Sequence, residues 1–140
     1  MEISILVIEE DFDLSKLFDH LLRIDGYEIT LAHDWQMAQA AMAMSQPDLI
    51  IFDWALTNSD GYLWIDDLRA TPETAHIPVI ALSANAVPRD IEKSLDAGFF
   101  NYLTKPIKVD LFMDALDMAL KTAEAAARIK AGRAYQQEKT

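Results

Sequence analysis

The chain has 140 residues, of which 51% are hydrophobic and 25% charged, the composition of an ordinary globular domain. Its net charge of −11 disfavours nucleic acid and anionic lipid as partners, because both are negatively charged themselves. The absence of cysteine excludes disulfides and thiolate chemistry, and no hydrophobic run reaches the ~18 residues of a membrane span. The first residues also lack a signal-peptide pattern, so we expect a cytoplasmic domain without membrane contact.

Short hydrophobic runs alternate with amphipathic stretches along the chain. In chain order, the predicted strands span residues 3–8, 27–32, 49–52, 77–82 and 99–103, and a predicted helix follows each one. Gly26 and Gly98 suit the ends of the first and fourth helices, and Asp34 suits the start of the second. This alternation predicts an α/β fold, a flavodoxin-like doubly wound (βα)5 domain with a five-stranded parallel sheet.

The charge changes sign near the C-terminus. Residues 1–120 hold seven basic and twenty-one acidic side chains, whereas residues 121–140 hold five basic and two acidic ones. The sequence therefore predicts one domain over residues 1–122, followed by a basic, Ala-rich extension of the last helix over residues 123–140. Alanine favours helix, but this extension offers little hydrophobic surface, so we expect its far end to fray or to dock on another chain.

Polar side chains follow four of the predicted strands. Glu9 and Glu10 come after the first strand, Asp53 after the third, Ser83 after the fourth and Lys105 after the fifth. If the strand order is 2-1-3-4-5, these positions converge at the carboxyl edge of the sheet, where ligands bind in such folds. Clustered carboxylates suit a hard cation such as Mg²⁺, and a hydroxyl and an ammonium beside it suit a phosphoryl group.

These segments resemble the response-regulator receiver domain of two-component signalling, from about Ile3 to Leu120. The resemblance rests on ILVIEED, LIIFDWAL, VIALSA and YLTKP, which occur in the order and spacing of that family. It implies that Asp53 takes a phosphoryl group from a histidine kinase or a histidine phosphotransfer protein and thereby switches a protein-binding surface. It implies no enzyme activity beyond promoting the domain's own phosphotransfer and dephosphorylation.

The resemblance also implies roles for single residues. The implied Mg²⁺ ligands are Glu9, Glu10, Asp53 and the carbonyl of Ala55. Ser83 and Lys105 would bind phosphoryl oxygens, and Ser83 and Tyr102 would change on activation. The Lys105–Pro106 peptide is implied to be cis, which is costly unless the fold specifies it. A homodimer through the last helices is a further expectation.

Two positions depart from the family pattern. Glu10 stands where the family has Asp, and Thr57 stands where it has Pro. The longer Glu10 side chain predicts Mg²⁺ binding no tighter than with aspartate. This departure keeps open an alternative, a pseudo-receiver that binds proteins without being phosphorylated. The segment from Ala81 to Leu116 is most similar to C-terminal receivers of hybrid sensor histidine kinases.

Other interpretations of these residues are weaker. A flavodoxin would have Gly, Ser and Thr after its first strand to bind phosphate, and a haloacid-dehalogenase-like phosphatase would have a second Asp where Ala55 stands. Asp11 or Asp13 suits a cap of the first helix. The remaining candidates are predicted to serve packing or surface roles: His20, His33, His76, Trp35, Trp54 and Trp64.

Overall fold

The computed structural model describes residues 3–53, 61–84, 95–96 and 98–122. Several predictions fall outside these residues: most of the fourth helix, the Ala55 carbonyl, Thr57, Trp54 and the basic extension. The strands are β1 (Ser4–Ile8), β2 (Glu28–Ala32), β3 (Leu49–Asp53), β4 (Val79–Ser83) and β5 (Asn101–Thr104). The helices are α1 (Phe12–Ile24), α2 (Trp35–Met44), α3 (Gly61–Ala70) and a last helix over residues 109–122.

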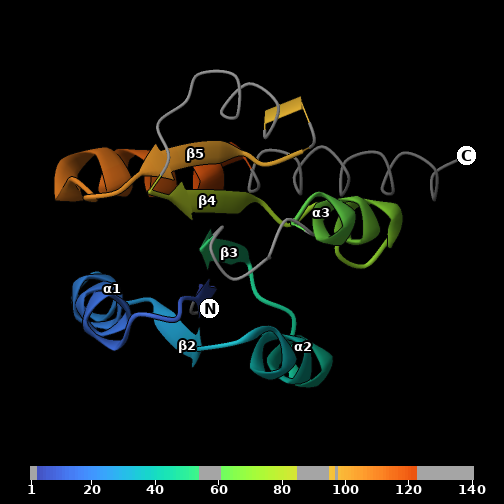
Figure 1. The fold of residues 1–140 in the computed structure, drawn as a ribbon, viewed down its shortest axis with the longest axis horizontal. Coiled ribbons are helices and arrows are strands. Elements are labelled where there is room, and N and C mark those ends of the chain that lie inside the picture. The colour runs from blue at the N-terminus through green and yellow to red at the C-terminus, as the bar shows by residue number, and fades with distance from the viewer. Residues whose placement is uncertain (1–2, 54–60, 85–94, 97, 123–140) are drawn as a thin grey trace, which may run out of the picture.

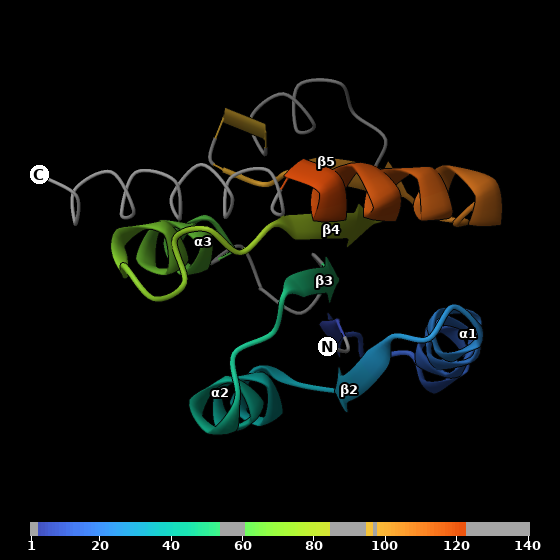
Figure 2. The same cartoon turned by 180° about the vertical axis from the view of Figure 1, so that it is seen from behind.

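All five strands are parallel and lie in the order β2-β1-β3-β4-β5, which confirms the predicted fold. Helix α1 and the last helix lie on one side of the sheet, and α2 and α3 lie on the other (Figure 1, Figure 2). The first connection carries the chain from β1 outward to β2, and the next returns it to β3. The strand order therefore reverses beside β1, and the carboxyl ends of β1 and β3 lie together at this switch point.

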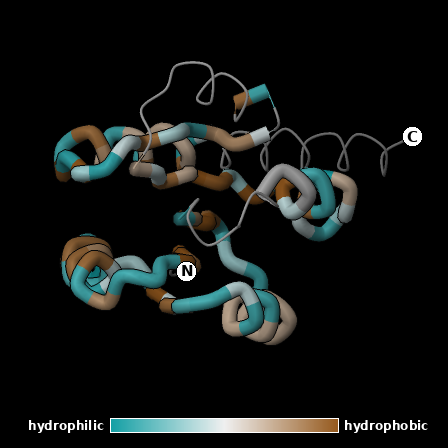
Figure 3. Tube along the Cα trace, viewed as in Figure 1, coloured by the Kyte–Doolittle hydropathy of each residue, from teal (hydrophilic) through white to brown (hydrophobic). Residues whose placement is uncertain are grey.

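Each face of the sheet has its own hydrophobic core. One core joins alternate strand residues such as Val7 and Ile51 to Phe18 of α1 and Phe112 of the last helix. The other joins the intervening strand residues, including Phe52, to α2 and α3. Strands covered on both faces are hydrophobic at nearly every position, whereas hydrophobic and hydrophilic segments alternate along the helices that cover them (Figure 3). The two cores together hold the strands in place, and the carboxyl ends of these strands carry the site.

Polar caps begin two of the helices, and a glycine follows the end of one, where the sequence predicts. The Asp11 carboxylate accepts hydrogen bonds from the amides of Asp13 and Leu14 and so caps α1. Asp34 caps α2 by accepting a bond from the Met37 amide at 2.8 Å. Gly26 has a φ of 88°, a left-handed conformation that glycine adopts without strain, and it returns the chain from α1 toward β2.

The fourth and fifth strands begin later in the structure than the sequence predicts. The run of residues 77–82 predicts the fourth strand, whereas β4 spans Val79–Ser83. Pro78 has no N–H and joins the sheet only by its carbonyl, which accepts a bond from the Ile50 amide at 3.0 Å. Phe99 likewise precedes β5 and is buried in the core without being part of the strand. Both shifts carry the strands further toward the carboxyl edge.

No helix in the part of the chain that the structure describes is long and hydrophobic enough to cross a membrane.

Candidate phosphorylation site

The strand register brings four of the predicted site residues to one edge of the sheet. Ile8 pairs with Phe52, so Glu9 and Asp53 occupy neighbouring positions at the ends of β1 and β3. Ser83 ends β4 and pairs with Thr104, the residue before Lys105. The Lys105 amide also donates a hydrogen bond to the Ser83 carbonyl at 2.7 Å, which ties the start of the β5 loop to β4.

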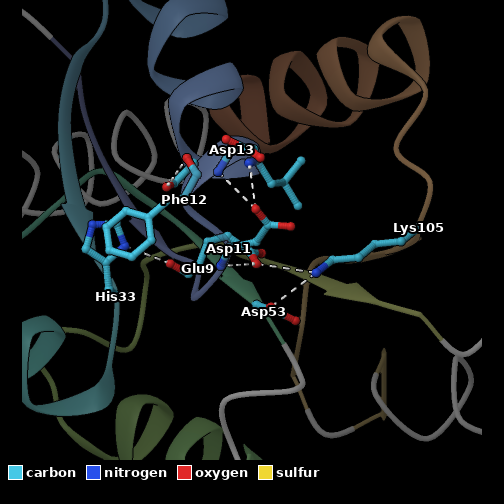
Figure 4. A network of polar contacts seen from close by, with 9 residues as sticks. Glu9, Asp11, Phe12, Asp13, His33, Asp53 and Lys105 are labelled. Carbon is cyan, nitrogen blue, oxygen red and sulfur yellow. Dashed lines mark hydrogen bonds and ion pairs between the residues drawn. The ribbon is translucent and has the colours of Figure 1, made fainter.

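A single lysine joins the two buried carboxylates (Figure 4). Lys105 Nζ lies 3.1 Å from Asp53 Oδ2 and 3.4 Å from Glu9 Oε1. The carboxylate side chains are only 1% exposed for Glu9 and 4% for Asp53, whereas the lysine side chain is 27% exposed. The ammonium therefore approaches from the open side of the site and compensates two charges at once. Removing two carboxylates from water is costly, so the ammonium contact offsets part of this cost.

The positive charge of Lys105 compensates the charges of the two carboxylates only in part. Burial, followed by the interaction with the Asp53 carboxyl, raises the pKa of Glu9 to about 7, although the Asp11 N–H and the Lys105 charge oppose the rise. Burial lowers the pKa of Lys105, but its hydrogen bond to Asp53 and the charges of Asp53 and Glu9 outweigh this, and the net pKa is raised. Two carboxylates and one ammonium thus leave an excess of negative charge in a buried place.

One oxygen of Glu9 is left without a partner among the residues that the structure covers. Oε1 accepts a bond from the Asp11 amide at 3.1 Å and faces Lys105, whereas Oε2 is buried and accepts no hydrogen bond. A buried carboxylate oxygen in this state costs free energy unless a cation or a proton meets it. Glu9 and Asp53 together therefore fit a hard divalent cation, which binds one or two carboxylates and completes its shell with other oxygens.

Glu10 differs from its neighbour in burial. Its side chain is exposed, whereas Glu9 is buried. The carboxylates and imidazoles within the described ranges form no group of three that could hold a metal ion by themselves. A ligand set of three protein oxygens would therefore need the Ala55 carbonyl, which lies outside the described residues, or a different position of the long Glu10 side chain.

The structure places the remaining predicted residues as follows. The peptide between Lys105 and Pro106 is cis. Tyr102 lies in β5, is 8% exposed and belongs to the core on the α2–α3 side. Asp11 caps α1, as one of the sequence interpretations expects.

Sequence reasoning missed one contact of the site. His33, predicted to have only a surface or packing role, directly follows β2 and places its Nδ1 3.1 Å from the Glu9 carbonyl oxygen. Its ring also lies against Phe12, with 4.3 Å between the ring centroids. A histidine after a strand is a weak signal, and only the register of β1 with β2 shows that it lies beside Glu9.

The chain belongs to the response-regulator receiver family. The family model described as the response regulator receiver domain matches residues 5–117. A transcriptional regulatory protein of Staphylococcus aureus, KdpE, is 34% identical over 79% of this chain and 46% of its own length. RpaA of Synechocystis, described as a DNA-binding dual master transcriptional regulator, is 38% identical over 76% of this chain and 44% of its own. The chain spans less than half the length of these relatives.

Solved structures agree with this assignment. NtrX from Brucella abortus superposes with a TM-score of 0.83 at 25% identity, over 95% of this chain and 29% of that one. The signal receiver domain of a histidine kinase from Syntrophus aciditrophicus has a TM-score of 0.74 at 29% identity, over 85% and 90% of the two chains. The chain is thus a receiver domain of two-component signalling, a class of switch modules that are generally not catalysts.

The comparisons bear on the expected partners. Receiver domains interact with histidine kinases or phosphotransfer proteins, which agrees with the first expectation. The expectation that nucleic acid plays no part finds no support, because relatives such as RpaA are named as DNA-binding regulators. The net charge of −11 disfavours nucleic acid only at the surface of this domain. The specific likeness to hybrid kinases stays a prediction.

The raised pKa of Glu9 predicts a pH-dependent stability in the absence of metal. A carboxyl whose pKa is higher in the folded state binds more protons there, so stability falls as pH rises from about 4.5 to about 7. The slope from one group is at most about 1.4 kcal/mol per pH unit. Urea unfolding in EDTA between pH 5 and pH 8 would measure it. Glu9→Gln should flatten this part of the profile, and Glu73→Gln, at an exposed turn, should not.

Proposed function

We propose that this domain accepts a phosphoryl group on Asp53 from the phosphohistidine of a histidine kinase or histidine phosphotransfer protein, with Mg²⁺ present. The observation that carries this proposal is the buried pair of Glu9 and Asp53 bridged by Lys105 at the carboxyl edge of the sheet. A carboxylate of this kind is a nucleophile that needs a partner cation for the incoming phosphate charge. The family assignment supports the same function.

The residues would divide the chemistry in the following way. An Asp53 oxygen attacks phosphorus in line with the leaving imidazole, a P–O bond forms, and the P–N bond breaks with its electron pair going to nitrogen. Lys105, already 3.1 Å from Asp53, follows the negative charge onto the phosphoryl oxygens. Ser83, at the end of the neighbouring strand, would donate its hydroxyl to one of these oxygens. Changes at Ser83 and Tyr102 would then carry the switch to a protein-binding surface.

The proposed metal ligands are Glu9, Asp53, Glu10 and the carbonyl of Ala55. When bound, Mg²⁺ supplies positive charge that offsets the repulsion between the carboxylates and the phosphoryl group. The raised pKa of Glu9 and its unpartnered oxygen support the first of these ligands. The exposed Glu10 would have to reach the ion from outside, so we expect binding no tighter than with aspartate at this position.

The proposal extends to the rest of the chain. Residues 1–122 would form the receiver domain and residues 123–140 a basic extension of its last helix. Leu111 and Met118 of the last helix are 54% and 62% exposed, which agrees with a homodimer through these helices. A cytoplasmic location fits the proposed donors.

Phosphorylation of the wild-type chain tests the function. The protein is incubated with a small phosphodonor such as acetyl phosphate or phosphoramidate, with Mg²⁺ or with EDTA, and its intact mass is measured. We expect one phosphoryl group to be added with Mg²⁺ and little without it. Reduction by borohydride converts an aspartyl phosphate to homoserine, and peptide mass analysis would locate it at position 53. No labelling in the folded protein would favour the pseudo-receiver alternative.

A further inference from the structure

We propose that His33 is a positioning residue for the phosphorylation site, which holds Glu9 in place through a hydrogen bond to the Glu9 backbone. The inference rests on the proposed function in one respect, because Glu9 is the carboxylate proposed to bind Mg²⁺. His33 directly follows β2, and β2 contributes no carboxylate, hydroxyl or ammonium group to the site.

The backbone of Glu9 is held on both sides by two consecutive residues. Its amide donates to the Ala32 carbonyl at 3.0 Å, which continues the pairing of β1 with β2. Its carbonyl lies 3.1 Å from His33 Nδ1. A carbonyl oxygen only accepts hydrogen bonds, so the hydrogen is on Nδ1 and His33 is the donor. The hydrogen bond from the His33 side chain thus extends the contact between β1 and β2 beyond the last backbone hydrogen bond of the pair.

The His33 ring is itself fixed by a second contact. Phe12, the first residue of α1, lies against it at 4.3 Å between centroids and at 40° between planes (Figure 4). Phe12 is 62% exposed and His33 is half-buried, so the two rings cover the outside of the turn between β1 and α1. The short segment from Glu9 to Phe12 is therefore held to His33 at both of its ends.

The position of the Glu9 backbone matters because it sets the positions of both oxygens of the Glu9 side chain. Its Oε1 accepts from the Asp11 amide within the same turn and faces Lys105 at 3.4 Å, and its Oε2 is the buried oxygen without a hydrogen bond. A rotation of the Glu9 peptide would displace both oxygens from their buried positions. Mg²⁺ requires near-octahedral oxygen geometry, so it is sensitive to such displacement. Residues that orient a metal ligand typically change metal affinity by about 10- to 100-fold when they are replaced.

Two substitutions at position 33 separate the hydrogen bond from packing. His33→Leu keeps an apolar side chain against Phe12 and removes the donor. His33→Asn removes most of the ring contact and keeps an N–H close to the place of Nδ1. A role for the hydrogen bond predicts that leucine weakens Mg²⁺ binding and asparagine does not, whereas a packing role predicts the reverse. His20→Asn, on an exposed position of α1, is the matched control.

The readout is the Mg²⁺ dissociation constant of the full chain by isothermal titration calorimetry, together with the melting temperature. We expect His33→Leu to bind Mg²⁺ about tenfold more weakly than wild type and His33→Asn to stay within about twofold, the lower end of such effects. Equal Mg²⁺ affinity in wild type and His33→Leu would overturn the proposal. So would a loss in His33→Asn as large as that in His33→Leu. If His33→Leu does not fold, His33→Ala replaces it as the variant without a donor.

The same experiments separate this inference from the proposed function. A wild-type chain that binds Mg²⁺ but takes no phosphoryl group refutes phosphorylation at Asp53, and the affinities of the two His33 variants still decide the role of His33. A wild-type chain that is labelled, with His33→Leu unchanged in Mg²⁺ affinity, refutes the role of His33 alone. A wild-type chain that binds no Mg²⁺ overturns both.

Discussion

Replacing Asp53 by asparagine should abolish phosphoryl labelling with a small phosphodonor and Mg²⁺. Asparagine has nearly the shape of aspartate, so the end of β3 should stay intact, but its amide is a far weaker nucleophile than a carboxylate. The free energy of unfolding should rise, because one of two buried carboxylates has lost its charge. At pH 8 without metal we expect a gain of about 1 kcal/mol, as the pKa of Glu9 moves back toward its ordinary value.

Asp53→Asn is thus expected to lose phosphoryl labelling and to gain stability, which distinguishes it from a misfolded variant. A variant that merely misfolded would lose both labelling and stability. Asp66→Asn, at an exposed position of α3, is the matched control and should change neither. Labelling of Asp53→Asn to the full wild-type extent would show that another residue accepts the phosphoryl group. A lower stability of Asp53→Asn would contradict the expected gain and show that the Asp53 carboxylate stabilises the fold.

The hydrophobic pattern was enough to predict an α/β fold with a parallel sheet, whereas the strand order came with the resemblance to the receiver family. The run of residues 49–52 in β3 is hydrophobic at every position, which indicates a strand covered on both faces, and the alternation of such runs with helices indicates a parallel sheet. The pattern was less informative about where strands begin. Pro78 and Phe99 are hydrophobic and buried but precede their strands, because a hydrophobic pattern indicates burial and not the pairing of backbone N–H groups.

The site could be predicted in part because topology brings strand ends together. Once the order of the sheet is given, residues at the carboxyl ends of β1, β3 and β5 lie at one edge, and Glu9, Asp53 and Lys105 contact one another there. Contacts that depend on a side chain's reach were not predictable in the same way. Glu10 adjoins Glu9 in sequence yet is exposed, and His33 is 24 residues from Glu9 yet bonds to it.

Replacing Lys105 by alanine should have the largest effect on stability among the site residues. The buried carboxylates of Glu9 and Asp53 would lose the ammonium that contacts both of them. Breaking a fully buried pair costs about 3–5 kcal/mol, but this lysine is partly exposed and Glu9 can take up a proton, so we expect a loss of about 2 kcal/mol at pH 8 without metal. At pH 5, below the pKa of about 7, Glu9 is already protonated and the loss should be smaller.

The same substitution should affect metal and phosphate in opposite directions. Mg²⁺ should bind at least as tightly as in wild type, because the ammonium no longer competes for the carboxylate oxygens. Phosphorylation of Asp53 should nevertheless slow by about 100-fold, the typical cost of losing one group that stabilises developing charge. Lys108→Ala, at an exposed position three residues away, provides the control for urea unfolding, Mg²⁺ titration and labelling. Wild-type stability at pH 8 combined with a wild-type labelling rate would mean that Lys105 is a surface lysine, and that the charge of Glu9 and Asp53 is compensated without it.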